Sequence, residues 1–306
     1  PAVHRLDSTL SESGNYILMK SGKKMNQVKE ILAQSNRDVM MVENCGMENE
    51  HIYRSVEEIP DDAGYYSLII AKEKKIHMIE TKNLTKTFDS FTAVDHLNLK
   101  IESGEFFGLL GPNGAGKTTT ISLLSTLLLP TEGEILIDGQ TLTRSRPDLK
   151  RKISVITQEY SMRQDMNMDE IMEYQGRLYF MPKKEIRRRT ELLDFCDLLK
   201  FRKRTVRKLS GGMKRKLMVC RALLTEPEIL LLDEPTAGMD ALSRRQMWNL
   251  LRQLNGKNLT ILLTTHYMEE AQSLCGRVAL MDHGKLEEVN TPSGLIDSLG
   301  KYTVDE

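Results

Sequence analysis

Apolar and polar positions form two patterns along the chain, one typical of buried strands and one typical of helices. Continuous apolar runs predict fully buried strands at Phe106–Leu110, Ile229–Leu232 and Leu259–Thr264. A shorter strand is predicted at Ile153–Ile156. Helical stretches are predicted at Thr119–Leu129, Asp169–Leu178, Lys183–Leu193 and Gly212–Leu224. Buried strands that alternate with helices indicate a parallel sheet covered on both faces.

A different strand pattern flanks the first buried run. Residues 93–101 alternate apolar and polar side chains, which predicts a half-buried antiparallel strand. Pro130 should end the helix before it and Gly133 should turn the chain. A short strand then follows at Glu134–Ile137, and Asp138–Gly139 predicts a hairpin turn.

The first 76 residues predict a small α/β domain of their own. Its expected elements are a strand at Tyr16–Met19, a helix at Met25–Gln34, and strands at Val39–Val42 and Tyr65–Ala71. The charged run Lys72–Lys75 breaks this pattern, and a new strand is expected over Ile76–Glu80. We therefore predict two domains, 1–76 and 77–306.

Composition narrows the class of protein. Lys+Arg and Asp+Glu both number 43 in 306 residues, so bulk charge argues neither for nor against a nucleic-acid partner. The basic runs Arg187–Arg189 and Arg202–Arg204 have no interleaved aromatic platform, which favours solvated faces. Four scattered cysteines without a C-x-x-C pair indicate reduced thiols rather than a disulfide framework or a zinc site. No apolar run approaches the ~18 residues of a membrane span, and the polar start predicts no signal peptide, so a membrane role should work through a partner.

One stretch matches a phosphate-binding motif, the P-loop. Residues Gly111–Thr119 read G-P-N-G-A-G-K-T-T, which fits G-x-x-x-x-G-K-[ST] between a predicted strand and a predicted helix. Glycines let the backbone wrap around phosphates with its N–H groups inward, and the helix N-terminus adds partial positive charge. Lys117 would reach the outer phosphates, and the Thr118 hydroxyl would reach Mg²⁺. The predicted nucleotide-binding residues are Gly111, Pro112, Asn113, Gly114, Ala115, Gly116, Lys117, Thr118 and Thr119.

Four polar residues lie just past the ends of the other predicted strands, where parallel sheets bind their ligands. Asp233 should hold Mg²⁺, directly or through water, and Glu234 should act as general base toward the attacking water. Gln158 would reach the metal ion or the water through its amide oxygen. His266 would contact the γ-phosphate beside Glu234. Taken singly, Glu234 fits a surface salt bridge equally well, and a lone histidine is more often a packed core residue.

A second phosphate-type element occurs at Leu209–Met213, immediately before a predicted helix. The Ser210 hydroxyl, the amides of Gly211 and Gly212 and the helix N-terminus form a predicted anion site. The chain has one P-loop, so this element has no free phosphate in its own chain. It makes sense if it closes over nucleotide bound to another copy.

The order of these motifs resembles the nucleotide-binding subunit of ABC transporters over residues 77–306. The family's motifs are matched by Walker A at Gly111–Thr119, the Q-loop at Gln158, the signature at Leu209–Met213, Walker B at Ile229–Glu234, the D-loop at Ala237–Asp240 and the switch histidine at His266. Phe88 lies where the family places an aromatic residue that stacks on adenine. The resemblance implies an α/β P-loop NTPase: a RecA-like core, an antiparallel β subdomain and a helical subdomain at about 144–226.

The resemblance also implies ATP and Mg²⁺ as cofactors, and a head-to-tail homodimer with two ATP molecules between P-loop and signature. ATP binding would close this dimer, and hydrolysis with product release would reopen it. A membrane permease would detect the motion through the groove beside Gln158, which places the chain in the cytoplasm at the inner face of the cell membrane. No nucleic-acid partner is expected.

Within the family, three stretches resemble subunits that serve ABC-2 type exporters, the drug-resistance and nodulation-export group. These stretches are Phe106–Gly116, Thr236–Asp240 and Thr264–Ala271. The signature continues as Met213–Lys216, where many importer subunits have glutamines, and this also favours export. The cargo is not readable from the chain, because specificity would lie in the permease.

Two other functions are open from the sequence alone. A soluble ABC protein that acts on ribosomes or DNA usually carries two cassettes or a long coiled-coil insertion, and this chain has one cassette and no heptad run. Residues 1–76 resemble the C-terminal part of tetrapyrrole methyltransferases such as precorrin-2 C20-methyltransferase, notably at Asn15–Lys20, Asn44–Met47 and Tyr65–Ile70. The half in which such enzymes begin the S-adenosylmethionine site is missing. This favours a fusion remnant or an accessory interaction domain over a methyltransferase.

Overall fold

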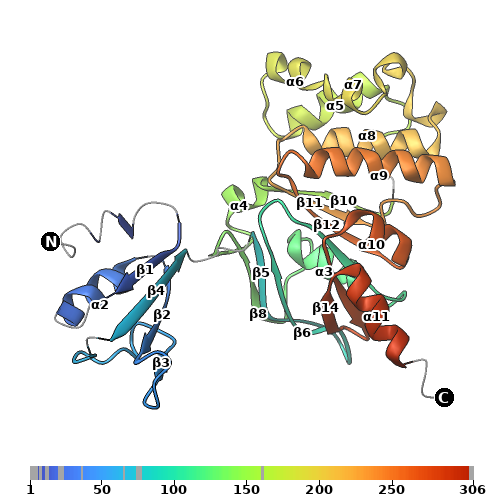
Figure 1. Cartoon of the computed structure of the whole chain (residues 1–306). Helices are drawn as coiled ribbons and strands as arrows, with labels where there is room; N and C mark the ends of the chain where they lie inside the picture. Colours follow the sequence, from blue (N-terminus) through green and yellow to red (C-terminus); the bar gives the residue numbers. More distant parts are fainter. Residues whose placement is uncertain are drawn as a thin grey trace. The chain divides into compact units, whose positions relative to one another are not determined.

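Two units make up the chain in the computed structural model, Pro1–Ile76 and His77–Glu306 (Figure 1). The structure describes residues 6, 9–10, 14–19, 24–35, 37–64, 66–73, 78–159 and 162–302, without the side chains of 73, 187–189 and 299–302. Tyr65, the Lys74–Lys75 part of the charged run and the expected strand start at Ile76 lie outside the described residues.

The first unit contains an antiparallel sheet on which helix α2 packs. Its strands lie in the order β1 (Tyr16–Met19), β4 (Ser67–Glu73), β2 (Arg37–Glu43) and β3 (His51–Tyr53). Helix α2 (Met25–Gln34) buries Met25, Val28 and Leu32 in one cluster with Met41 of the sheet. Strand β3 was not predicted from the apolar pattern, because its side chains are exposed or half-buried and give no clear alternation.

The second unit is organised around a six-stranded sheet. Its strands lie in the order β10 (Ile153–Ile156), β11 (Ile229–Asp233), β12 (Thr260–Thr265), β7 (Phe106–Leu110), β13 (Arg277–Asp282) and β14 (Lys285–Asn290). The first five strands run parallel, and β13 and β14 form an antiparallel hairpin. Every residue of β7, β11 and β12 is buried, so the predicted buried runs and their parallel sheet are confirmed.

A four-stranded antiparallel sheet shares the core of this unit. Its order is β6 (Phe91–Ile101), β5 (Ile79–Phe88), β8 (Glu132–Ile137) and β9 (Gln140–Thr141). Asp138 and Gly139 join β8 to β9 with φ of 49° and 69°, the two left-handed positions of the predicted hairpin turn. Helix α3 (Lys117–Leu124) packs Ile121 and Leu124 into a cluster that contains residues of both sheets.

Two predicted helices have different lengths in the structure. Helix α3 ends at Leu124 rather than Leu129, because Thr126 takes a left-handed φ of 61° that a right-handed helix cannot contain. The predicted helix Lys183–Leu193 is interrupted. It forms α6 (Lys183–Arg189) and α7 (Leu192–Phe195), because the Glu191 carbonyl starts a new set of hydrogen bonds to the N–H groups of Asp194 and Phe195.

Helices α5, α6, α7 and α8 gather at one end of the second unit, with α9 beside α8 (Figure 1). The helices of this unit besides α3, α6 and α7 are α4 (Pro147–Arg151), α5 (Met168–Leu178), α8 (Gly211–Leu223), α9 (Ala241–Asn255), α10 (Met268–Leu274) and α11 (Pro292–Tyr302), with short 3₁₀ turns at Leu199–Phe201 and Val206–Lys208. The range 144–226, expected to form the helical subdomain, also contains the predicted strand β10, which belongs to the six-stranded sheet. Among the described residues, no helix has the length and apolarity needed to cross a membrane.

Candidate nucleotide-binding site

The P-loop lies between β7 and α3, at the carboxyl edge of the six-stranded sheet. Leu110 at the end of β7 pairs with Thr265 of β12, and Asp233 at the end of β11 pairs with Thr264. The Gly111 N–H then donates to the Thr265 carbonyl at 3.3 Å. This register brings the residues that follow three neighbouring strands to one edge, as the strand pattern predicts.

Two glycines of the P-loop adopt left-handed conformations, with φ of 86° at Gly114 and 98° at Gly116. A Cβ atom at Gly116 would lie 2.4 Å from the carbonyl oxygen of Ala93 in β6, whereas a Cβ at Gly114 would meet nothing within 4 Å. Gly116 is therefore required both by its dihedral angle and by the close approach of β6, and Gly114 by its dihedral angle alone.

Lys117 is the first residue of α3 and folds back over the loop. Lys117 is only 5% exposed. Its Nζ donates to the carbonyl oxygens of Gly111 at 2.7 Å and Pro112 at 2.8 Å. Burial lowers the pKa of Lys117, while the nearby Glu234 and Asp233 carboxylates act in the opposite direction. A cation held over a loop of inward amides forms a cradle for anions such as phosphates.

The Asp233 carboxylate is buried and accepts hydrogen bonds from two hydroxyl groups. Its Oδ1 accepts hydrogen bonds from Thr264 Oγ1 at 2.6 Å and from Thr118 Oγ1 at 3.1 Å. The residue is 4% exposed. A buried carboxylate beside a hydroxyl forms a set of oxygen donors that suits Mg²⁺, and neither donor neutralises its charge. Asp233 and Thr118 therefore fit the Mg²⁺ ion that the P-loop motif requires.

Glu234 and His266 form a pair beside this carboxylate. The His266 Nδ1 lies 3.1 Å from Glu234 Oε1. Glu234 has a left-handed φ of 44°, and its N–H donates to Thr264 Oγ1 at 3.0 Å. A non-glycine residue in this conformation is strained, and such strain persists where the surrounding structure fixes it. The Thr264 hydroxyl thus orients both acids, because it accepts from one residue and donates to the other.

The P-loop, Gln158 and Glu234 line one cavity of about 360 Å³, here called the nucleotide cavity, whereas Asp233 and His266 are not among its lining residues. Its lining consists of Phe91, Ala93, Asn113, Gly114, Gly116, Lys117, Thr118, Thr119, Gln158 and Glu234. The structure thus brings Gln158 together with the P-loop and Glu234, although they are far apart in the sequence. Phe88 is 42% exposed and is not among the lining residues; Phe91, its partner across the β5–β6 pair, takes that place. Sequence reasoning missed Phe91, for which the only signal was a second aromatic residue in the same hairpin.

The signature residues face a different cavity of about 410 Å³, here called the signature cavity. Ser210 and Gly212 line it together with Ser243 of α9. Lys200, Lys216 and Asp197 also line it, and Lys216 forms an ion pair with Asp197 at 3.5 Å. Ser210 caps α8 by accepting a hydrogen bond from the Met213 N–H at 3.2 Å. Within one chain, the structure therefore does not bring Ser210, Gly211 and Gly212 to the P-loop.

Comparison with known proteins identifies the family. The ABC transporter family matches residues 94–237. Nod factor export ATP-binding protein I of Cupriavidus metallidurans is 38% identical over 222 residues, which cover 72% of this chain and 73% of that protein. The daunorubicin/doxorubicin resistance ATP-binding protein DrrA of Streptomyces peucetius is 40% identical over 223 residues, covering 72% and 68%. The chain belongs to the family of ABC transporter ATP-binding proteins.

Similarity to solved structures supports the assignment to this family. A dimeric ATP-binding cassette in a post-hydrolysis state, bound to ADP and phosphate, matches with a TM-score of 0.63 and 29% identity over 70% of this chain and 99% of that one. The predicted ABC ATPase fold is confirmed, and the chain is an ATP-binding and ATP-hydrolysing subunit. The family match lies within the second unit, so the resemblance of residues 1–76 to methyltransferases stays a prediction.

Gly116→Ala should damage the nucleotide cavity more than Gly114→Ala. Both changes carry the cost of a left-handed alanine, about 1–2 kcal/mol, and Gly116→Ala adds a clash with the Ala93 carbonyl. We expect at least tenfold weaker ATP binding by calorimetry for Gly116→Ala and a smaller loss for Gly114→Ala, in line with about 1.4 kcal/mol per tenfold. Equal losses in the two variants would show that the approach of β6 does not shape this loop.

Proposed function

We propose that this chain is the ATPase subunit of an ABC-2 type exporter, and that ATP-driven closure of a head-to-tail homodimer powers a separate membrane permease. The observation that carries the proposal is the division of the site. The P-loop, Gln158 and Glu234 line one cavity, and Ser210 and Gly212 line another. Two copies arranged head to tail complete each other's sites. Identities of 38% and 40% to export and resistance ATP-binding proteins support the direction of transport.

In the proposed reaction, water attacks the γ-phosphorus of ATP, the bond from that phosphorus to the oxygen shared with the β-phosphate breaks, and Glu234 accepts the proton from the water. His266, with its Nδ1 at 3.1 Å from Glu234 Oε1, holds the carboxylate in place. Thr118, Asp233 and Gln158 are the proposed ligands of Mg²⁺, which would neutralise charge on the phosphates. Lys117 and the P-loop amides hold the phosphates in position for this attack.

ATP would act on the dimer because it contacts two chains at once. In the open state only the P-loop side binds nucleotide, and in the closed state the Ser210–Gly212 side of the other copy adds further contacts. A ligand that binds one state more tightly shifts the population toward it. Hydrolysis removes the bridging γ-phosphate, so the closed state loses its advantage and the dimer reopens.

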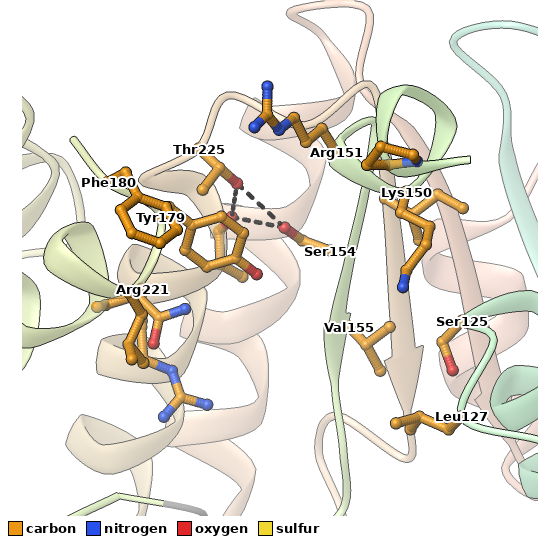
Figure 2. Close-up of a pocket in the computed structure, with 15 residues that line it drawn as sticks. Ser125, Leu127, Lys150, Arg151, Ser154, Val155, Tyr179, Phe180, Arg221 and Thr225 are labelled. Carbon is orange, nitrogen blue, oxygen red and sulfur yellow. Dashed lines mark hydrogen bonds between the residues drawn. The ribbon is translucent and has the colours of Figure 1, made fainter. Parts of the chain in front are cut away.

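A groove on the second unit supports the proposal of a membrane partner. It has a volume of about 480 Å³ and lies between α4 and β10 on one side and α5 and α8 on the other. Figure 2 shows Tyr179 and Phe180 on one side of it and Leu127 and Val155 on the other. Phe180 is 91% exposed, and Gln158 follows two residues after the end of β10. A short apolar segment of a permease that filled this groove would thus contact the strand that leads to the nucleotide cavity.

The alternatives are less well supported. A soluble ABC protein of ribosomes or DNA has no specific observation in its favour, because the similar proteins named above serve export and drug resistance. For residues 1–76, an accessory role beside the cassette remains the proposal, with the methyltransferase as its competitor. Calorimetric titration with S-adenosylmethionine separates the two, since an accessory unit should show no saturable binding.

Glu234→Gln should abolish ATP turnover and leave ATP binding intact. The amide keeps the shape of the side chain but cannot accept the proton, so we expect the rate to fall on the order of 10²-fold or more. The variant should accumulate as an ATP-bound dimer, detectable by size-exclusion chromatography with light scattering. Lys117→Ala is the matched variant, in which ATP affinity itself should fall. Normal turnover by Glu234→Gln would remove the general-base assignment.

Phe91→Ala should weaken ATP binding more than Phe88→Ala, because Phe91 lines the nucleotide cavity and Phe88 does not. Stacking of a base on an aromatic ring contributes ~1–3 kcal/mol, so a loss of about fivefold or more is expected. The affinity of each variant for ATP and for inorganic triphosphate separates base contacts from phosphate contacts. A larger loss in Phe88→Ala than in Phe91→Ala would show that Phe88 contacts the adenine, as the sequence pattern predicts.

Phe180→Glu should disconnect the cassette from its permease and leave the ATP affinity unchanged. An exposed aromatic in a groove is a typical binding hot spot, and its loss should weaken association about tenfold or more. The measurement is copurification from membranes in which the chain is coexpressed with a candidate ABC-2 type permease. Ile296→Glu on α11 is the matched control, because it also changes an exposed apolar residue. Equal retention of both variants would contradict the assigned groove.

A further inference from the structure

Glu270 is a buried acid that the nucleotide cavity does not use. It lies in α10 and is 1% exposed. Its Oε1 accepts hydrogen bonds from Thr236 Oγ1 at 2.7 Å and from Trp248 Nε1 at 3.1 Å. Both donors are neutral, and no ion pair of Glu270 is found in the part of the chain that the structure describes. A carboxyl group buried in this way is costly, so packing alone does not account for it.

The two donors belong to different segments of the second unit. Thr236 opens the loop 236–240, which joins β11 to α9. Trp248 lies in α9 itself. Glu270 belongs to the helix that begins two residues after His266. One carboxylate oxygen therefore links the 236–240 loop, α9 and the helix attached to the switch histidine.

The 236–240 loop is connected to the signature cavity. Asp240, its last residue, caps α9 through the Ser243 N–H at 2.9 Å and the Ser243 hydroxyl at 2.6 Å. A Cβ atom at Gly212 would lie 3.2 Å from Ser243 Oγ, so the start of α9 touches the signature directly. Gly238 in the loop is exposed and has a left-handed φ of 71°. A nucleotide placed against the signature would thus contact a surface that continues into this loop.

At its other end, the link reaches the catalytic pair. His266 contacts Glu234 Oε1 at 3.1 Å, and the next residue, Tyr267, donates its N–H to Thr265 Oγ1 at 3.0 Å. The backbone carbonyl of Tyr267 then accepts from the Glu270 N–H at 3.2 Å. Any displacement of Glu270 is therefore passed to the segment that holds His266 against Glu234.

We propose that Glu270 is a positioning residue that couples the signature surface of a chain to the Glu234–His266 pair of the same chain. Contact of a second copy's ATP with the signature cavity shifts the start of α9 and the 236–240 loop, and the Thr236–Glu270 bond transmits this shift to α10. The inference rests on the proposed function for the presence of the second copy. It adds that the two ATP sites of the dimer communicate through a buried bond in each chain, so that hydrolysis is cooperative.

The chain offers closely matched variants for a test. Thr236→Val removes the donated hydroxyl and keeps the shape, while Thr236→Ser keeps the hydroxyl. Glu270→Gln keeps the shape and removes the charge. Glu269→Gln makes the same chemical change at the neighbouring, exposed position of α10. Thermal unfolding of each full-length variant identifies any that fail to fold. If Glu270→Gln does not fold, the test relies on Thr236→Val, which is the smallest change.

Steady-state ATP hydrolysis gives the first readout. A hydrogen bond to a charged group contributes enough for a loss of kcat on the order of tenfold when it is removed. We expect this loss, together with a Hill coefficient that falls toward one, in Thr236→Val. We expect a smaller loss in Glu270→Gln, because its amide oxygen still accepts from Thr236 and Trp248 but carries no charge. ATP affinity, measured by calorimetry in the Glu234→Gln background, should stay within about twofold of the parent, since neither residue lines the nucleotide cavity. Thr236→Ser and Glu269→Gln should behave as the wild-type chain.

Trp248 supplies the second readout, because it is the only tryptophan of the chain and its indole N–H donates to Glu270. In the Glu234→Gln variant, addition of ATP and Mg²⁺ should shift its fluorescence emission as the dimer closes. With Thr236→Val added, ATP should bind with the same affinity and the emission shift should be smaller, because Glu270 no longer follows the 236–240 loop. This separation of binding from the optical signal is not expected of a residue that only stabilises the fold.

The possible results distinguish a failure of the proposed function from a failure of the role assigned to Glu270. If the wild-type chain binds no ATP and forms no ATP-dependent dimer, the proposed function fails. If the wild-type chain is cooperative and Thr236→Val and Glu270→Gln keep both its Hill coefficient and its emission response, the role of Glu270 is wrong and the proposed function stands. Equal losses of kcat in Glu269→Gln and Glu270→Gln would also refute the assignment, because they would show a general effect of charge on α10.

Discussion

The buried carboxylate of Asp233 is the group on which the rest of the cassette depends. It is joined through hydroxyl groups to Thr118 at the start of α3 and to Thr264 in β12, so it ties the P-loop helix to the centre of the sheet. A charge held in this way is stable only where a cation or its equivalent completes it. Slippage of β11 by one residue would turn the side chain to the opposite face of the sheet. The register of β11 in the sheet therefore also determines whether the Asp233 carboxylate faces the P-loop.

Around this group, the chain accepts conformations that folding alone disfavours. Glu234 has a left-handed φ of 44°, and Gly116 fits under β6 only because it has no Cβ. Lys117 is buried with its ammonium group against two carbonyl groups. These costs are concentrated within the few residues that would touch phosphate or water. Strain of this kind is typical of sites where geometry must be fixed before the ligand arrives.

Much of the candidate site could be predicted from the sequence, because several of its members follow strands that are buried and largely apolar. Asp233, Glu234 and His266 were placed by the ends of β11 and β12, and the P-loop was placed by its motif. What the pattern missed depends on tertiary contacts. The length of α3 is decided by one left-handed residue, Thr126, which has no sequence signal of its own.

Side-chain environments were harder to predict than the positions of strands. Phe88 and Phe91 are both aromatic residues of one hairpin, and only the three-dimensional course of that hairpin shows which of them lines the cavity. Glu270 follows Glu269 in a short helix, where both residues suggest a solvated face, yet Glu270 is buried between Thr236 and Trp248. Periodicity reports which face of an element is apolar, and it does not reveal a polar residue that the core encloses.

The separation of the nucleotide cavity from the signature cavity has a genetic consequence. If each working site takes one half from either copy, a cell that makes a normal and a defective form of this chain together also assembles mixed dimers. A defect in either half then impairs a site to which the normal copy contributes. Substitutions in these two cavities should therefore act dominantly when both forms are present, whereas substitutions that merely prevent folding should act recessively, because unfolded copies never enter a dimer.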